Sequence, residues 1–173
     1  MIKEISTGYE PRPLQAIMHA KLQRFNVIVC HRRFGKTVFA VNEKLDRALS
    51  CEKRNPQVAY IAPTYGQAER IAWQMLKEYS SMLPGVEYNE SKLKCTIKRG
   101  YPYNDKVTIF LMGAENPDSI RGMYLDGVVF DEFSEMNPEI WGKVVRPALA
   151  DRRGWAIFIG TPKGQNHFYE MYK

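Results

Sequence analysis

Residues 30–37, with the sequence CHRRFGKT, have the residue types of a phosphate-binding loop. The segment departs from the pattern G-x-x-x-x-G-K-[ST] at its first position, where Cys30 replaces glycine. Backbone N–H groups of such a loop surround phosphate oxygens at a helix N-terminus, where the helix dipole favours negative charge. We therefore expect Lys36 to reach the β- and γ-phosphates of a nucleotide and the Thr37 hydroxyl to ligate magnesium.

A second candidate site lies at the end of the apolar segment 127–132, which reads GVVFDE. A buried strand that ends in a carboxylate places Asp131 where it can hold magnesium through water. Glu132, the next residue, can polarise an attacking water. Solvated acids at the end of an ordinary strand are the plainer interpretation, but a phosphate-binding loop upstream favours the catalytic one.

Arginine is the third component of the predicted site. Arg32 and Arg33 lie inside the phosphate loop, where a guanidinium can bind phosphate oxygens through two parallel hydrogen bonds. Arg121 lies in the short segment SIRG, residues 119–122, just before the strand that ends at Asp131. Spacing alone is equally compatible with a surface arginine in a turn at Arg121.

Two weaker patterns leave their alternatives open. Tyr9, Arg12 and Gln15 precede the first predicted strand and could stack on and hydrogen-bond an adenine, or could simply begin a helix. A lysine-rich hairpin could touch the phosphates of a polymer, although a run of charges is usually a solvated face. Its basic residues are Lys92, Lys94, Lys98, Arg99 and Lys106.

The elements that must position these residues alternate between short apolar strands and helices. Strands are predicted over 26–30, 58–62, 127–130 and 155–159, and a hairpin insertion over roughly 92–112. Helices are predicted over 13–24, 36–49, 67–82, from about 138, and over 166–173. This order indicates an α/β domain with a mainly parallel sheet covered by helices on both faces. Ligands bind such sheets beyond the carboxyl ends of the strands, so Lys36-Thr37, Asp131-Glu132 and Thr161 should meet at one edge.

Composition narrows the class of protein. The 173 residues suffice for one domain with a substantial core, and the formal net charge of +6 weakly favours an anionic partner such as nucleic acid. No apolar run reaches the ~20 residues of a membrane helix, and the first five residues have no signal-peptide pattern. The three cysteines form no C-x-x-C pair, so a zinc site is not expected and free thiols fit a reducing cytoplasm.

Taken in order, these motifs resemble one known family, the large terminase subunit of tailed bacteriophages, the motor that packs DNA into capsids. The resemblance extends from Tyr9 to Tyr172 and rests on the joint order and spacing of motifs that are each moderately specific. The matching segments are 9–15 (adenine motif), 31–37 (variant Walker A loop), 61–67 (after the second strand), 119–122 with 128–132 (Walker B region), and 160–164 with Phe168-Tyr169 (coupling motif).

The resemblance implies a P-loop NTPase of the ASCE/RecA-like type that uses ATP and Mg²⁺ to translocate double-stranded DNA into a procapsid. It implies a cis arginine finger at Arg32, a trans finger at Arg121, and a coupling role for Gly160, Thr161 and Pro162, with Thr161 sensing the γ-phosphate. The nucleotide-binding residues that it implies are Tyr9, Arg12, Gln15, His31, Arg32, Arg33, Phe34, Gly35, Lys36 and Thr37.

The same resemblance implies a portal protein, a small terminase subunit and a homo-oligomeric ring, commonly a pentamer, as partners in the cytoplasm of the host cell. In isolation we expect the domain to be a monomer, without a membrane partner. Family members also carry an RNase H-like nuclease domain, and no segment of residues 1–173 matches it. We therefore expect residues 1–173 to be the ATPase domain alone, without nuclease activity.

Two other functions remain open. A helicase-like motor of superfamily 1 or 2 also uses a P-loop, but it needs a second RecA-like domain to supply arginines, and strand separation would identify it. A non-catalytic nucleotide-binding assembly module would have no need of a water-activating acid such as Glu132. Measured phosphate release distinguishes that module from a motor.

Overall fold

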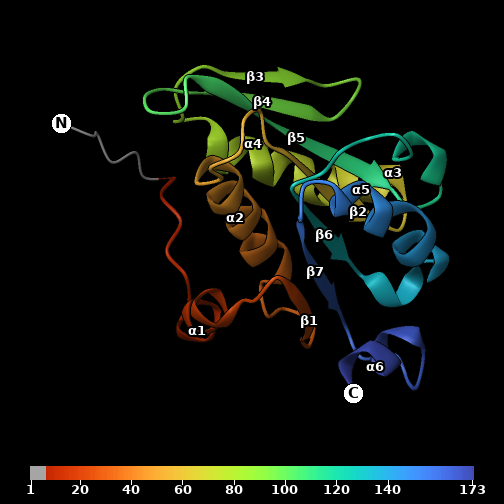
Figure 1. Ribbon diagram of the computed structural model, residues 1–173. Helices are drawn as coiled ribbons and strands as arrows, with labels where there is room; N and C mark the ends of the chain where they lie inside the picture. Colours follow the sequence, from red (N-terminus) through yellow and green to blue (C-terminus); the bar gives the residue numbers. More distant parts are fainter. Residues whose placement is uncertain (1–6) are drawn as a thin grey trace.

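A single seven-stranded sheet forms the centre of the molecule in the computed structural model, which describes residues 7–173 (Figure 1). The strand order is β1-β7-β6-β2-β5-β4-β3, and the first five strands run parallel. The strands are β1 Phe25–Val29, β2 Gln57–Ala62, β3 Val86–Asn89, β4 Lys94–Arg99, β5 Asp105–Gly113, β6 Gly127–Asp131 and β7 Trp155–Gly160. The predicted α/β fold with a mainly parallel sheet is confirmed.

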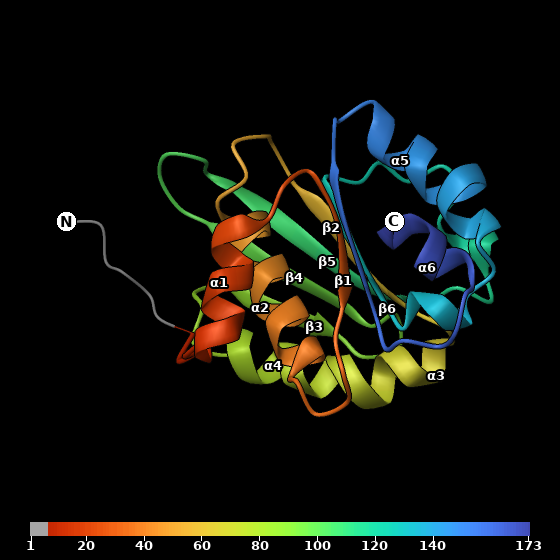
Figure 2. The same cartoon turned by 90° about the horizontal axis from the view of Figure 1, so that it is seen from below.

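Helices cover both faces of this sheet, as the view in Figure 2 shows. The α-helices are α1 Pro13–Lys21, α2 Lys36–Leu49, α3 Tyr65–Gln67, α4 Gln74–Ser80, α5 Arg146–Ala150 and α6 His167–Tyr172. A π-helical segment, Ala68–Trp73, joins α3 to α4, and a second one, Ile140–Val145, precedes α5. The prediction of one regular helix over 67–82 missed this change of helix type.

The alternation of side chains along each strand divides the core into two layers. On β6, Val129 packs with α2 and α4 on one face, while Val128 and Phe130 pack with α5 and α6 on the other. Both sets are fully buried, which explains why β6 and β7 are nearly continuous apolar runs in the sequence.

The predicted hairpin is present as β4 and β5, but it is part of the main sheet instead of an insertion outside it. β5 pairs in parallel with β2, and β4 and β3 extend the sheet in antiparallel fashion. The sequence analysis missed β3 because its four residues, VEYN, alternate between polar and apolar types and contain no apolar run.

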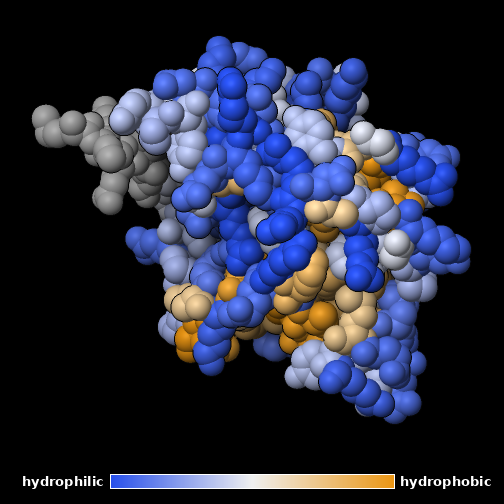
Figure 3. All heavy atoms as spheres, viewed as in Figure 1, coloured by the Kyte–Doolittle hydropathy of each residue, from blue (hydrophilic) through white to orange (hydrophobic). Residues whose placement is uncertain are grey.

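At the opposite edge, β1 pairs only with β7 among the described strands, and none of its residues is fully buried. In Figure 3, hydrophobic side chains gather over the region where β1 and β7 lie. No helix of residues 7–173 is both long and apolar enough to cross a bilayer. The first five residues, where we saw no signal-peptide pattern, lie outside the described part of the chain.

A buried ion pair fastens the β4–β5 hairpin to the far end of α2. Arg99 donates two hydrogen bonds of 2.7 Å to Asp105, and both side chains are less than 5% exposed. The same guanidinium also donates to the backbone carbonyls of Leu49, Cys51 and Lys53. These bonds fix the C-terminal end of the helix whose N-terminal end carries Lys36.

Arg99→Ala should therefore destabilise the fold strongly, by about 3–5 kcal/mol, because it leaves the Asp105 carboxylate buried without its partner. Chemical denaturation followed by circular dichroism measures this change. The neighbouring Lys98 is the matched control, because its ion pair with Glu87 is two-thirds exposed at both ends. Lys98→Ala should cost less than about 1 kcal/mol. Equal losses in the two variants would contradict the role assigned to the buried pair.

Candidate nucleotide and magnesium site

The phosphate-binding loop connects β1 to α2 and is shaped by residues with a left-handed backbone. Gly35, the N-cap of α2, has φ 87°, a conformation that glycine adopts without steric cost. A Cβ atom at Gly35 would approach the side-chain Nε2 of Gln15 to 2.8 Å, and that nitrogen donates a 3.1 Å hydrogen bond to the Gly35 carbonyl. The last glycine of the motif is therefore required by both backbone and packing.

Helix α2 begins at Lys36, so Lys36 and Thr37 lie in its first turn. That turn contains no acidic residue, and the N-terminal backbone N–H groups of a helix carry partial positive charge. The end of α2 that faces the carboxyl edge of the sheet is therefore suited to an anion.

The ends of β6 and β7 meet the start of α2 at Lys36, as the sequence predicted. Its ammonium donates to Oε1 of Glu132 at 2.7 Å and to the Thr161 hydroxyl at 2.6 Å. Glu132 follows β6 directly and Thr161 follows β7 directly. The backbone N–H of Thr161 also donates to Oε2 of Glu132 at 3.2 Å, so both carboxylate oxygens have partners.

Asp131 lies beneath this group and is 5% exposed. Its Oδ2 atom accepts from the Thr37 hydroxyl at 3.2 Å and from the Tyr60 hydroxyl. Its Oδ1 atom accepts from the backbone N–H of Glu132 at 3.0 Å. The structure thus brings the two predicted magnesium ligands, Thr37 and Asp131, together.

The two adjacent acids have opposite electrostatic environments. Burial raises the pKa of Asp131, against the lowering effect of the hydrogen bond from Tyr60. Burial also disfavours the charged form of Glu132, but the hydrogen bond and charge of Lys36 outweigh it and lower the pKa of that carboxyl. Glu132 is therefore ionised throughout the neutral pH range.

Glu132 is also held in an unusual backbone conformation, with φ 54° and ψ 45°. A non-glycine residue in the left-handed region costs on the order of 1–3 kcal/mol, and such residues cluster at functional sites. This turn directs the carboxylate of Glu132 toward Lys36 while the carboxylate of Asp131 points to Thr37.

The donor set at this edge fits magnesium with a nucleotide. A hydroxyl and a carboxylate oxygen are ligands that Mg²⁺ accepts, and this ion commonly takes only one or two protein ligands and fills its shell with water and phosphate oxygens. In residues 7–173 no group of three or more His, Cys, Asp or Glu side chains could hold a metal ion. A site completed by phosphate and water is therefore the arrangement that these residues fit.

A hollow of about 320 Å³ adjoins the loop and is a candidate for the adenine. Its lining comes from the start of α1 and from the phosphate loop: Arg12, Pro13, Leu14, Gln15, His31, Arg33 and Phe34. Gln15 is buried, its Oε1 accepts from the backbone N–H of Arg12, and its Nε2 donates to the Gly35 carbonyl, so Gln15 ties the start of α1 to the loop. Five of the predicted nucleotide-binding residues therefore line this one hollow: Arg12, Gln15, His31, Arg33 and Phe34.

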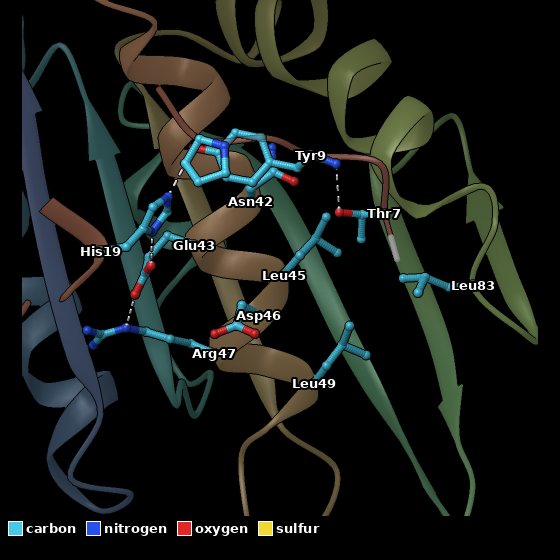
Figure 4. Close-up of a pocket in the computed structure, with 11 residues that line it drawn as sticks. Thr7, Tyr9, His19, Asn42, Glu43, Leu45, Asp46, Arg47, Leu49 and Leu83 are labelled. Carbon is cyan, nitrogen blue, oxygen red and sulfur yellow. Dashed lines mark hydrogen bonds and ion pairs between the residues drawn. The ribbon is translucent and has the colours of Figure 1, made fainter. Parts of the chain in front are cut away.

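Tyr9 does not border that hollow. It lines a separate one of about 670 Å³ beside α2, shown in Figure 4, where its hydroxyl hydrogen-bonds His19 at 3.0 Å. His19 in turn contacts Glu43, which pairs with Arg47. Among the described interactions, Tyr9 ties the chain entering α1 to α2, so the geometry gives no support to its predicted contact with adenine.

The arginines lie at the surface. Arg32 and Arg33 are exposed on the phosphate loop. Arg121 lies on the connection between β5 and β6, is 62% exposed and pairs with Asp118 at 3.1 Å. Of the predicted coupling residues, Gly160 accepts a hydrogen bond from the backbone N–H of Cys30, Thr161 contacts Glu132, and Pro162 is exposed.

The sequence analysis missed Tyr60, which contacts Asp131 from the neighbouring strand. Its position in the apolar run VAYIA carried one usable signal, because a buried tyrosine hydroxyl usually finds a hydrogen-bond partner. Pairing between β2 and β6, which only the structure gives, identifies that partner.

The comparisons with known proteins agree with this geometry. A family model described as "Terminase large subunit, T4likevirus-type, N-terminal" matches residues 28–173. The terminase large subunit of Thermus phage G20c is 30% identical over 178 residues, covering 95% of this chain and 36% of that protein. The terminase large subunit of Escherichia phage T5 is 28% identical over 155 residues, covering 86% of this chain and 33% of that protein. The chain therefore spans about a third of the length of these curated relatives.

Solved structures show the same fold. The large terminase ATPase domain of Thermus phage P74-26 superposes with a TM-score of 0.82 at 28% identity, covering 96% of this chain and 70% of that chain. The large terminase of a thermophilic bacteriophage, solved in complex with ADP, superposes with a TM-score of 0.74 at 18% identity, covering 92% of this chain and 40% of that chain. With its motifs, its sheet and its family match in agreement, this chain belongs to the terminase large subunit family and corresponds to the N-terminal region of that subunit.

Proposed function

We propose that this chain binds ATP with Mg²⁺ at the carboxyl edge of its sheet, hydrolyses it, and so drives double-stranded viral DNA into a procapsid. The observation that carries the proposal is the convergence of Lys36, Glu132 and Thr161 within hydrogen-bonding distance, from the start of α2 and the ends of β6 and β7. The ATPase domain of the similar Thermus phage terminase and the ADP complex with the same fold support the choice of nucleotide.

The roles of the residues follow from where they lie. Lys36 and the N-terminus of α2 bind the β- and γ-phosphates, while Thr37 and Asp131 hold magnesium, which neutralises phosphate charge when bound. Glu132 stays ionised and orients the attacking water. To bind phosphate, the ammonium of Lys36 has to share or give up its contact with Glu132, which frees that carboxylate for the water.

Thr161 is suited to report the state of the site. Its hydroxyl accepts from Lys36 and donates to Glu132, and it directly follows β7, the strand between β1 and β6. A change at the γ-phosphate that moves Lys36 or Glu132 would therefore reach β7 through Thr161, consistent with a coupling role for residues 160–162. Gln15, Arg12, His31, Arg33 and Phe34 form the proposed surroundings of the adenine.

The wider assembly is also part of the proposal. The family context supports a ring of copies, commonly five, that works with a portal protein, a small terminase subunit and DNA in the cytoplasm of the infected host. The domain should be monomeric when isolated, and we propose no nuclease activity for residues 1–173. A non-catalytic assembly module is disfavoured because Glu132 is held, ionised, beside the phosphate-binding lysine.

Exchange of single residues separates binding from hydrolysis. Glu132→Gln should keep ATP affinity nearly intact and reduce turnover by a factor on the order of 10²–10⁴, because it removes the group that orients the water. Lys36→Ala should weaken nucleotide binding itself. Titration calorimetry with ATP and a phosphate-release assay measure the two effects, and equal losses of affinity in both variants would show that this division of roles is wrong.

The two candidate arginine fingers predict different behaviour in mixtures. An arginine finger is worth roughly 10³–10⁵ in rate. Arg32, on the phosphate loop, can serve only its own active site, whereas the exposed Arg121 on the β5–β6 connection can reach a neighbouring copy. Arg121→Ala chains mixed with Glu132→Gln chains should therefore recover ATP turnover under conditions that promote assembly.

Arg32→Ala chains in the same mixture should stay inactive, since their defect lies in their own loop. Each variant assayed alone provides the baseline, and wild-type chains provide the check that assembly occurs. If the Arg121→Ala mixture stays inactive while wild-type chains assemble and turn over, Arg121 does not act in trans.

A further inference from the structure

The orientation of Asp131 is fixed by three hydrogen-bond donors from three different parts of the chain. Thr37 and Tyr60 both donate to Oδ2, and the backbone of Glu132 donates to Oδ1. Two of the three, from Thr37 and Glu132, belong to the proposed catalytic machinery. Tyr60 is the remaining side-chain donor, and no part of the proposed reaction uses it.

The sheet itself places Tyr60 opposite the acid. Tyr60 of β2 is the register partner of Val129 of β6, and Asp131 lies two residues further along β6 on the same face. The tyrosine side chain is long enough to reach forward along that face to the carboxylate. Strand pairing in the middle of the sheet therefore sets this contact.

The ring of Tyr60 is held on all sides. It is 1% exposed and packs in the core between β2 and α2. The side-chain nitrogen of Lys44 on α2, also fully buried, lies 4.9 Å from the centre of the ring and has no hydrogen-bond partner among the described residues. Burial lowers the pKa of Lys44 to about 7, so its contact with the ring is mainly one of packing. A ring fixed in this way gives the hydroxyl one direction in which to point.

The hydroxyl also keeps its proton. A tyrosine hydroxyl, with an ordinary pKa of about 10, is protonated at neutral pH, so Tyr60 acts as a donor to Asp131 there. Partners that orient a metal-binding carboxylate in this way typically contribute roughly 10- to 100-fold to metal affinity.

We infer that Tyr60 is a positioning residue for magnesium, whose hydroxyl holds the Asp131 carboxylate in the orientation that lets it act together with Thr37. The inference rests on the proposed nucleotide and magnesium site. It adds to that site a residue that lies in the core between β2 and α2 and contacts the magnesium ligand Asp131 from within. Tyr60 acts through Asp131, to which its hydroxyl donates.

A purely structural role for the hydroxyl predicts something different. In that case its removal would lower the stability of the fold and weaken nucleotide binding to the same extent with and without metal. A positioning role instead lowers only the magnesium-dependent part of binding. Comparison of the two conditions therefore separates the roles.

The experiment measures the affinity of the chain for ATPγS by titration calorimetry, in EDTA and over a series of Mg²⁺ concentrations. Tyr60→Phe keeps the ring and its contact with Lys44 but removes the hydroxyl. We expect the Mg²⁺ concentration for half-maximal enhancement of binding to rise roughly 10- to 100-fold. Affinity in EDTA should stay unchanged, and the melting temperature should stay close to that of the wild type.

Tyr88→Phe is the matched control. Its hydroxyl is part-buried against the same core layer and contacts Ser80 at 2.8 Å, but it lies on the edge strand β3, away from Asp131. This variant should show the wild-type response to Mg²⁺. An unchanged Mg²⁺ response in Tyr60→Phe, or an equal loss of affinity in EDTA and in Mg²⁺, overturns the inference.

Asp131→Asn distinguishes this inference from the proposed function on which it rests. If Asp131→Asn loses the Mg²⁺ enhancement and Tyr60→Phe keeps it, only the role of Tyr60 is wrong. If Asp131→Asn also responds like the wild type, the magnesium site itself is wrong, and the inference falls with it.

A second readout covers the case in which Tyr60→Phe does not fold. Replacement of Tyr60 by 3-fluorotyrosine keeps the hydroxyl donor and places a ¹⁹F label beside the contact with Asp131. The ¹⁹F resonance should shift when Mg²⁺ is added to the ATPγS-bound chain and should stay in place with ATPγS in EDTA. A resonance that does not respond to saturating Mg²⁺ and ATPγS contradicts the inference.

Discussion

The contact between the Lys36 ammonium and the Glu132 carboxylate, 2.7 Å apart, is the interaction on which the arrangement of the site depends. It joins residues 96 positions apart in the chain, and the lysine side chain is only 10% exposed. A largely buried ammonium without a carboxylate would be costly, so the start of α2 and the end of β6 have to lie at the same level. Thr161 completes the group because β7 runs between β1 and β6 and ends at the same edge.

A second set of contacts, in the core between β2 and α2, holds the residues next to this ion pair in place. Asp131 faces the core side of β6, where Tyr60 reaches it, and the ring of Tyr60 packs against the helix that starts at Lys36. The far end of that helix is fastened by Arg99 to the β4–β5 hairpin. The long core helix α2 is thus fixed at both ends, by catalytic residues at one end and by a buried guanidinium at the other.

Local patterns were enough to predict the residues at the sheet edge. A G-K-T at the start of a helix and an acid pair at the end of an apolar run each follow from short segments, and parallel strands bring such ends together. The same reasoning grouped Tyr9 with Arg12 and Gln15, but Tyr9 lines a different hollow. Tyr9 lies in the chain before α1, whereas Arg12 is the N-cap of α1 and Gln15 lies in its first turn, so no common periodicity sets their directions. Closeness in sequence therefore did not predict closeness in space for Tyr9, whereas the order of the strands did predict the contacts of Lys36.

The missed features share one physical cause, which is that they depend on pairing between distant segments. The partner of the Tyr60 hydroxyl follows from the register of β2 against β6, and the short β3 exists only because β4 offers it an edge. The π-helical segment Ala68–Trp73 contains no glycine or proline that would predict the change of helix type. Periodicity describes one segment at a time, so contacts of this kind become visible only when the sheet is assembled.

Phosphate release from ATP in the presence of Mg²⁺ tests the central claim most directly, measured with and without double-stranded DNA and at rising concentrations of the chain. A motor domain predicts slow release that increases with double-stranded DNA and rises more than proportionally with protein concentration, as neighbouring copies complete each other's sites. Bound ATP that yields no phosphate above the reagent blank at any concentration would contradict the account and would identify a nucleotide-binding module without turnover.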